Sequence, residues 1–497
     1  MDAIFASSLL TALSFSTAAV LVSILTILWI KASSKSPPGP WSLPVVGNIF
    51  LFGSLPHENV LKLAKHYGDV LSMKLGAKDV VILNSVDTVK EALVKNGSDF
   101  SGRPPLRSFV FCSNDAKTVA FTDFGPRYIK NRKATDIALR TVLDDSENFS
   151  NNVQEEAELL VKSLSNTENA KSFDPAPLLK YACCRIMFGL IFGKKLKNAF
   201  AKEVHQLMEC STAFIEGSAV GNTVDFMPWL EKLFKRQVKK VDDAVGQLLK
   251  FVYKIHELLK NSKPNENFSE TTFITAIEKV TTKDENSKTH FTEERVINIT
   301  SDCFGGGFEK LSTNLRWALG YLSTDTSLQK ELKKEIETVK GKEPLTLKDR
   351  PNMPLLEATV LEALRLSCSL PFALPHCTTK DTTVGGYKLK KGTCVFVNLW
   401  ACCHDPNYFT KPNTFNPHRF LNEKGKLVRP NCLFAYSAGD RKCPAEHFSK
   451  AILFVLLGKI LQNVDISWDK KSYSPYDGKF GLALRPRPYK ITVETNS

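Results

Sequence analysis

The sequence predicts a mainly helical protein with small β-sheets set to one side. Three observations indicate this fold class. Most of the region from Val86 to Lys340 has the apolar spacing of helices, and extended segments are concentrated before and after it. The chain has no strand–helix–strand alternation. It also lacks a Gly-x-Gly-x-x-Gly motif after a strand, which argues against a nucleotide-binding α/β fold.

Composition favours one large catalytic unit. The chain has 497 residues, of which 43% are hydrophobic, and no linker, low-complexity tract or repeat divides it after residue 40. The net charge of +14 suits an acidic partner or an anionic membrane. Nucleic-acid binding is not expected, because no interleaved basic and aromatic motif is present. Twelve cysteines without a Cys-x-x-Cys motif indicate reduced thiols rather than a disulfide or zinc framework.

The N-terminus predicts a membrane anchor. Residues 3–30 carry no charge and are long enough to cross a bilayer as one helix. A cleaved signal peptide would have a shorter apolar core and a basic start, whereas the only early charge is Asp2. Lys31 and Lys35 follow the apolar run and place its C-terminal flank in the cytosol. We therefore predict an anchor over residues 1–31.

Local signals then predict the elements in order. A proline-rich hinge covers residues 32–48, a short helix covers 58–67, and DVLSMKLGAKDVVILNS indicates a β-hairpin. Thr292 followed by two glutamates is typical of a helix N-terminus. The long helix that follows has apolar residues at helical spacing: Phe304, Phe308, Leu311 and Leu315. A last helix is predicted over 445–463, with short strands after it. The catalytic domain is thus expected to span 49–497.

The segment YSAGDRKCPAEHFSKAILFVLLGKIL is the most informative part of the chain. Cys443 stands just before a long apolar helix, whose N-terminus favours a thiolate. Arg441 and Lys442 are expected to lower the pKa of this thiol further. A thiolate at this position suits haem iron, whereas the plain alternative is a buried structural cysteine.

The segment YSAGDRKC resembles the cysteine-ligand loop of the cytochrome P-450 family, with Tyr436 and Ala445 in place of the family's Phe and last Gly. LEALRL resembles the family's Glu-x-x-Arg pair, and FNPHRF resembles the segment whose arginine meets that pair. The resemblance implies the cytochrome P-450 fold and haem b (iron protoporphyrin IX), with Cys443 as the axial iron ligand. It also implies three residues that support the haem loop: Glu362, Arg365 and Arg419.

Other segments resemble the haem-propionate contacts of the family. FGPRYIKNRKAT is similar to the helix that carries Trp-x-x-x-Arg, with Tyr128 in the Trp place and Arg132 in the Arg place. LPHCTTKDT supplies His376, and Arg441 is a further candidate. A phenol and these cations would suit two buried carboxylates.

The hinge, DFMPWL, VNLWACCHDP and GYKLKKGT resemble the microsomal branch of the family, which includes animal drug and steroid hydroxylases. This implies a single-pass enzyme of the endoplasmic reticulum membrane, with a cytosolic catalytic domain that oxidises a lipophilic steroid, fatty acid or xenobiotic. The implied partners are an NADPH-dependent flavoprotein reductase and, as a second candidate, cytochrome b5. We expect a basic face to meet the acidic reductase, formed by Lys133, Arg441, Lys442 and Lys450.

The stretch GGGFEKLSTNLRW resembles the helix that crosses the distal face of the haem. Gly306 and Gly307 take the family's small places, Glu309 takes the acid place, and Lys310 takes the threonine place. The glycines are expected to let the backbone approach the haem, in a locally widened helix that admits water. Cleaving the O–O bond needs protons, which a hydroxyl and a carboxyl normally relay. A charged lysine has donors but no acceptor.

Four interpretations of Lys310 remain open at this point. The side chain extends away along the helix and leaves a weakened monooxygenase, or it pairs with Glu309 through water and donates protons itself. Alternatively, the neutral amine binds the iron and holds an inactive state. Finally, the relay is dispensable because the protein rearranges or dehydrates peroxides without O2 or a reductase. A haem-binding protein of low activity is the remaining alternative.

Overall fold

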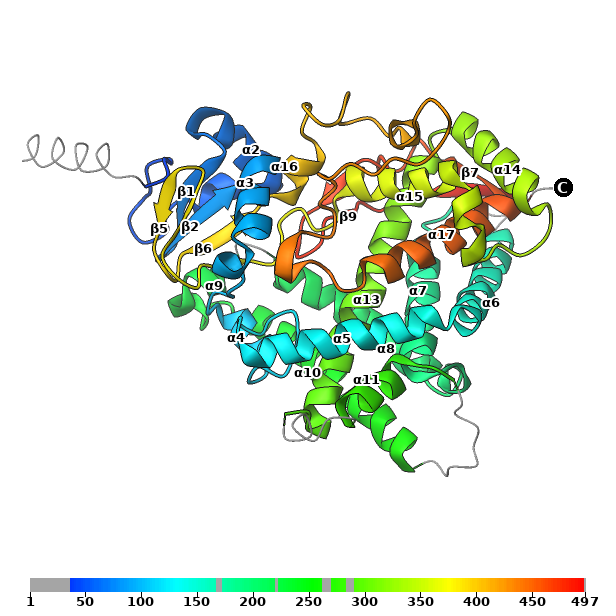
Figure 1. Cartoon of the computed structure of the whole chain (residues 1–497), viewed down its shortest axis with the longest axis horizontal. Helices are drawn as coiled ribbons and strands as arrows, with labels where there is room; N and C mark the ends of the chain where they lie inside the picture. Colours follow the sequence, from blue (N-terminus) through cyan, green and yellow to red (C-terminus); the bar gives the residue numbers. More distant parts are fainter. Residues whose placement is uncertain (1–35, 167–171, 220–221, 262–269, 283–289, 496–497) are drawn as a thin grey trace, which may run out of the picture.

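The computed structural model describes residues 36–166, 172–219, 222–261, 270–282 and 290–495. In this part of the chain a helical body carries a small sheet at one end (Figure 1). The helices are α2 Pro56–Tyr67, α3 Val86–Lys90, α4 Arg107–Ser113, α5 Pro126–Asp144, α6 Ser146–Ser165, α7 Ala176–Phe192, α8 Ala201–Gly217, α9 Thr223–Phe226, α10 Lys235–Asn261, α11 Phe273–Thr282, α13 Glu293–Leu322, α14 Thr326–Lys340, α15 Pro354–Ser367, α16 Leu399–Cys403 and α17 Glu446–Asn463. The strands are β1 Val70–Leu75, β2 Lys78–Leu83, β3 His376–Cys377, β4 Thr382–Val384, β5 Tyr387–Leu389, β6 Cys394–Val397, β7 Val464–Trp468, β8 Gly478–Lys479, β9 Arg485–Pro486 and β10 Ile491–Thr495.

The largest sheet joins distant parts of the sequence in the order β1-β2-β6-β3. The predicted hairpin is confirmed, since β1 and β2 pair antiparallel up to Leu75 and Lys78. Strand β6 pairs parallel with β2, and β3 pairs antiparallel with β6. Cys377 N also donates to Gly102 O at 2.8 Å. The C-terminal half therefore places His376 beside the segment that follows residue 100.

Helix α13 runs through the middle of the helical body (Figure 1) and packs against α7, α10, α15 and α17. The predicted start is confirmed, because Thr292 caps the helix and accepts a hydrogen bond from Arg295 N. The four apolar residues predicted on one face are all at most 2% exposed: Phe304, Phe308, Leu311 and Leu315. The expected local widening is absent, since α13 is a regular α-helix through its glycines.

Helix α17 starts within one residue of its predicted position, with Ala445 as the N-cap. Its apolar residues are buried on every side, which explains why the run HFSKAILFVLLGKIL has no polar face. This helix contacts α6, α13, α14 and α15. The segment before it, which carries Cys443, is consequently held against the core.

The predicted anchor over residues 1–31 lies outside the described residues. Among the helices that the structure does describe, none is both long and apolar enough to cross a membrane. Part of the predicted hinge is described, and it is fastened along β1. Ser72 N donates to Pro38 O at 2.7 Å, and Gly76 N donates to Val46 O at 3.1 Å. From residue 38 onward the proline-rich segment therefore belongs to the folded body.

Candidate haem site

The loop before α17 has a backbone that only a few residues can adopt. Gly439 has φ of +67°, and a Cβ there would collide with Leu93 O. Beyond this turn Cys443 N donates to Tyr436 O at 3.0 Å, which closes the loop. Cys443 is partly exposed and stands three residues before the first residue of α17. The glycine of the loop is thus required by close backbone contact.

The expected low pKa of Cys443 is not produced by this fold. Burial raises the pKa of the thiol above its ordinary value, while Ala445 N–H, Lys310 and Arg132 act in the opposite direction. Iron coordination itself deprotonates a thiol, so a ligand role does not need a low pKa in the metal-free fold.

The two cations expected to act on the thiol point elsewhere. Arg441 is buried and donates to Ser101 O at 2.7 Å and to Thr122 O at 2.9 Å. Lys442 forms an ion pair with Glu446 at 2.6 Å. The prediction that these two side chains activate the cysteine was wrong, because their adjacency in sequence says nothing about their direction in the loop.

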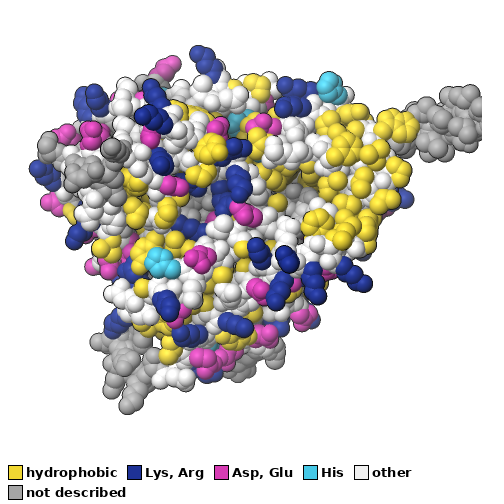
Figure 2. Space-filling model, turned by 180° about the vertical axis from the view of Figure 1, so that it is seen from behind, with side chains coloured by type: hydrophobic (Ala, Val, Ile, Leu, Met, Phe, Trp, Pro, Cys, Tyr) yellow, Lys and Arg dark blue, Asp and Glu magenta, His cyan; other side chains and the backbone are white. Residues whose placement is uncertain are grey.

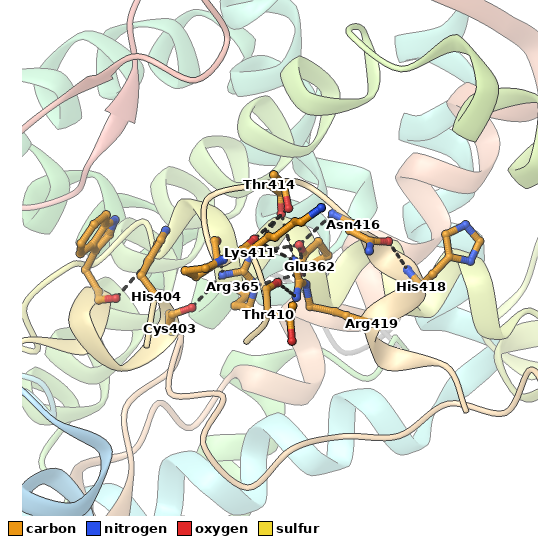
Figure 3. A network of polar contacts seen from close by, with 12 residues as sticks. Glu362, Arg365, Cys403, His404, Thr410, Lys411, Thr414, Asn416, His418 and Arg419 are labelled. Atoms are coloured by element: carbon orange, nitrogen blue, oxygen red, sulfur yellow. Dashed lines mark hydrogen bonds and ion pairs between the residues drawn. The ribbon is translucent and has the colours of Figure 1, made fainter. Parts of the chain in front are cut away.

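Glu362 and Arg365 form a buried network with the segment that follows α16 (Figure 3). Arg365 Nε and Nη2 lie 2.7 and 2.9 Å from the two carboxylate oxygens of Glu362. The remaining guanidinium N–H groups reach the backbone oxygens of Cys403, Pro412 and Thr414. With both side chains at 0% exposure, this is not an ordinary surface ion pair.

Arg419 completes this network from the opposite side (Figure 3). Its Nε lies 3.0 Å from Glu362 Oε1, which also accepts a hydrogen bond from Asn416 N at 2.9 Å. Its other nitrogens donate to the backbone oxygens of the irregular segment: Thr410, Lys411 and Thr414. One carboxylate therefore organises a segment that has little regular secondary structure.

The predicted propionate contacts gather around the same loop. Tyr128 O–H donates to Asp440 O at 2.8 Å, and the Arg441 guanidinium lies 3.6 Å from the centre of the Tyr128 ring. Arg132 Nη1 donates to Lys442 O at 2.6 Å, which fastens α5 to the loop. The structure thus brings three of the predicted residues together on one side of the cysteine.

His376 faces Phe100 O, to which Nδ1 donates at 2.8 Å. Burial holds the pKa of this imidazole well below its ordinary value, and the charges of Arg103 and Arg441 act in the same direction. The ring is therefore neutral in this fold. A carboxylate beside it would raise its pKa.

Arg103 is a site residue that the sequence reasoning missed. It is buried and donates to the backbone oxygens of Ala120, Leu374 and Pro375. No helix or strand periodicity marks it, and the only sequence signal was a lone arginine inside SGRPP. The turn before β3 brings it to His376 and Arg441.

The buried arginines Arg103 and Arg441 test whether a haem fits this site. Among the described residues neither Arg103 nor Arg441 forms an ion pair with a carboxylate, although both are buried. Burial lowers the pKa of both guanidinium groups, that of Arg441 to about 10. Asp123 acts on both through its charge, but its carboxylate accepts the backbone N–H of Arg103 and Phe124. A bound dicarboxylate would offset this uncompensated charge.

The three glycines of α13 have different surroundings. A Cβ on Gly305 would lie 2.6 Å from Leu248 Cδ2, and one on Gly307 would lie 2.5 Å from Met187 Cε. These two glycines admit α10 and α7. A Cβ on Gly306 would meet no atom within 4 Å. The prediction that a glycine clears space for a cofactor stays a prediction for Gly306, whereas Gly307 serves helix packing.

Glu309 is held by two other helices. Its Oε2 accepts from Ser211 Oγ at 2.8 Å and pairs with Lys180 Nζ at 2.9 Å. Lys310, the next residue, is about 100° further round the helix. Its Nζ is buried and has no hydrogen-bond partner among the described residues. A direct pair between Glu309 and Lys310 is not part of this fold.

The fold and the site together define a haem protein with a cysteine ligand. They combine a cysteine loop, a buried cluster of cations and a distal helix with open space beside Gly306. The comparisons name the family. Residues 37–493 match the family model of cytochrome P450. The chain is 32% identical to cytochrome P450 1A1 of Rattus norvegicus, over 93% of this chain and 90% of that protein. It is 34% identical to cytochrome P450 1A1 of Limanda limanda, over 90% and 88% of the two chains.

A third relative, cytochrome P450 1A2 of Callithrix jacchus, is 33% identical over 91% of this chain and 89% of that protein. The chain belongs to the cytochrome P450 family. It is a haem b monooxygenase of that family.

Proposed function

We propose that this protein is a membrane-anchored monooxygenase that inserts one oxygen atom of O2 into a lipophilic small molecule, a steroid, fatty acid or xenobiotic. Cys443 is the axial iron ligand, and a flavoprotein reductase supplies electrons from NADPH. The observation that carries this proposal is the pair of buried arginines, Arg103 and Arg441, which have no carboxylate partner among the described residues, beside a cysteine loop whose Cys443 lies within reach of the charge of Lys310 on α13. When bound, the haem supplies the centre at which O2 is activated.

The residues of the chain have separate tasks in this proposal. Cys443 donates electron density through its sulfur, and the closed loop holds that sulfur in place. Arg103 and Arg441 bind the two propionates and thereby fix the orientation of the haem in its site. Gly306 leaves room for a small ligand above the ring. Glu309 forms an ion pair with Lys180, and this pair carries protons at the edge of the distal helix.

A lipophilic substrate is supported by the segment between α4 and α5. Asp302 of α13 accepts hydrogen bonds from Val119 N and Ala120 N at 2.8 and 2.9 Å, which fixes this segment beside the distal helix. Phe109 and Phe121 from the same part of the chain pack edge to face at 5.3 Å. A substrate space bordered by these rings would exclude water and offer contact area rather than hydrogen bonds.

Membrane attachment is supported beyond the N-terminal run. Figure 2 shows hydrophobic side chains gathered at the end of the molecule that carries β1 and β2. Exposed apolar residues come from two segments that border the β1–β2 turn: Trp41, Leu43, Val45, Phe50, Trp229, Leu233 and Phe234. The sequence KLFKRQVKK adds cations beside the second segment. Apolar side chains next to cations are typical of an anionic membrane surface.

The expected reductase face needs a correction. Arg441 and Lys450 are buried, and Lys450 is paired with Glu446 at 2.7 Å, so neither can meet a partner. The exposed cations on this side are three residues of α5 together with one residue of the cysteine loop: Arg127, Lys130, Lys133 and Lys442. We place the docking surface for an acidic reductase there. Cytochrome b5 is a second candidate for the same surface.

Reconstitution with a reductase tests the proposal. The full chain in phospholipid vesicles should consume NADPH with a flavoprotein reductase and form a hydroxylated product from a panel of steroids, fatty acids and aromatic compounds. A protein with an intact thiolate–CO spectrum that forms no product on this panel would contradict it. Deleting residues 1–31 should release the protein from vesicles only in part, because the apolar surface remains.

A second candidate function is favoured by one observation, the absence of a hydroxyl at position 310. Members of the family that rearrange or dehydrate peroxides need neither O2 nor a reductase. This candidate predicts turnover of lipid hydroperoxides by the protein alone. The variant Lys310→Thr separates the two: a monooxygenase should gain product per NADPH, whereas a peroxide-rearranging enzyme should gain nothing from a reductase.

A further inference from the structure

The amine of Lys310 is enclosed without a partner. Its Nζ has no hydrogen bond among the described residues, whereas the amines of Lys180, Lys197 and Lys450 are all paired. A buried ammonium without a partner costs several kcal/mol. Burial accordingly lowers the pKa of Lys310 to about 8, although the thiols of Cys368 and Cys443 oppose this shift.

The position of Lys310 shows which space this amine faces. Gly306, Lys310 and Asn314 are four residues apart and share one face of α13. Asn314 lies close enough to Tyr436 of the cysteine loop to influence the pKa of its phenol, whose own hydrogen bond goes to Ser449 Oγ. The charge of Lys310 also acts on Cys443 itself. This face of the helix therefore looks toward the cysteine loop, across the space next to Gly306.

One of the four interpretations of Lys310 does not match these contacts. The side chain does not extend to solvent, since its Nζ is enclosed. A direct pair with Glu309 is also absent, because that carboxylate is bound by Ser211 and Lys180 on the α7–α8 side, and a link to Glu309 through water stays a prediction. The lowered pKa of Lys310 brings the neutral form of its amine within reach near neutral pH, and the lone pair of that form needs a Lewis acid or a hydrogen-bond donor.

We propose that the amine of Lys310 is the distal axial ligand of the haem iron in the resting protein, opposite Cys443. Iron accepts nitrogen ligands readily, and coordination would satisfy the amine that the fold leaves without a partner. The inference deepens the proposed function, because it rests on the same haem site. In a monooxygenase it means that the O2 position is closed in the substrate-free protein, before and after reduction, and opens when substrate displaces the lysine.

Spectroscopy of the resting ferric protein tests the proposal without reference to turnover. The haem-loaded full chain should show the absorption and paramagnetic-resonance signature of a low-spin iron with nitrogen and thiolate ligands. Lys310→Met should change this to the signature of a water-ligated or five-coordinate iron. Lys310→Arg, which keeps the charge but does not coordinate, should behave like Lys310→Met. The control Lys334→Met, at an exposed position of α14, should keep the original spectra.

Identical ferric spectra in the wild type and Lys310→Met would overturn the proposal, as would a Lys310→Arg variant that retains the nitrogen signature. Carbon monoxide binding to the reduced protein gives a second readout. In the wild type the rate should level off at high CO, because departure of the amine becomes limiting, whereas in Lys310→Met it should rise in proportion to CO. If the wild-type rate stays proportional to the CO concentration, the amine is not bound to the iron of the reduced protein, which contradicts the proposal. Since neither readout requires product, a failure of monooxygenation leaves the result interpretable.

Discussion

Glu362 and Arg365 form a two-pronged ion pair in which neither side chain has exposed surface, with bonds of 2.7 and 2.9 Å. Every other donor of the arginine is directed to the backbone of the segment between α16 and the cysteine loop. The pair therefore fixes that segment more than it stabilises α15. Charge buried in this way is costly unless all of its hydrogen bonds are made, and here they are made.

Removing the charge of Glu362 should unfold the haem side of the protein. Glu362→Gln leaves the buried guanidinium of Arg365 and the partly buried one of Arg419 without a counter-charge, and we expect a loss of about 3–5 kcal/mol. Denaturant unfolding and the haem content of the purified protein measure this. Glu331→Gln, an exposed acid paired with His418, should change stability by less than about 0.5 kcal/mol. Equal losses in the two variants would contradict the assigned role.

Replacing Arg103 should weaken haem retention. The guanidinium is expected to form a charge-assisted hydrogen bond with a propionate, and such a bond contributes about 1.5–3 kcal/mol. Arg103→Met should therefore release haem to an apo-globin acceptor roughly ten to a hundred times faster. The exposed Arg127, whose contact with Asp115 is 3.5 Å long, provides the control variant Arg127→Met. An unchanged release rate in Arg103→Met would exclude a propionate contact.

Cys443→Ala should abolish the thiolate signature of the ferrous–CO complex. Haem could still enter the site because the cationic cluster remains, so loss of the signature should accompany partial retention of haem. The control is Cys210→Ala, since Cys210 lies on α8 and its thiol contacts Gln247. If Cys443→Ala keeps the thiolate signature, another of the twelve cysteines is the ligand.

Asp302 makes stability depend on pH in an identifiable window. Burial raises the pKa of its carboxyl from 3.8 to about 6, so the folded protein binds this proton more tightly than the unfolded chain. The contribution of Asp302 to the free energy of unfolding is therefore greatest below pH 4. It falls as pH rises to about 6, by roughly 1.4 kcal/mol per unit of pKa shift.

Asp302→Asn keeps an acceptor oxygen for Val119 N and Ala120 N but carries no charge. The difference in unfolding free energy between wild type and variant should move in favour of the variant between pH 4 and pH 6. Chemical denaturation at several pH values measures it. A difference that stays constant over this range would show that the carboxylate is not enclosed.

The elements of the fold were largely predictable because they depend on local signals. The hairpin, the Thr292 cap and the helix after Ala445 follow from alternation, capping chemistry and apolar runs, and the structure confirms all three. The directions of individual side chains were less predictable. Lys450 was expected at a surface and is buried, where its amine is paired with Glu446 one turn away.

Sequence by itself determined the fold class, the family resemblance and the identity of the cysteine loop, since these depend on residue types at fixed short spacings. Only the tertiary structure decided which groups meet. It joined Arg103 to His376 and Arg441 across more than 270 residues, and it separated Gly306 from the two neighbouring glycines that serve packing. It also left the amine of Lys310 enclosed and without a hydrogen-bond partner in the described part of the chain. Burial and partner choice are properties of the packed chain, because they depend on segments that no local pattern relates.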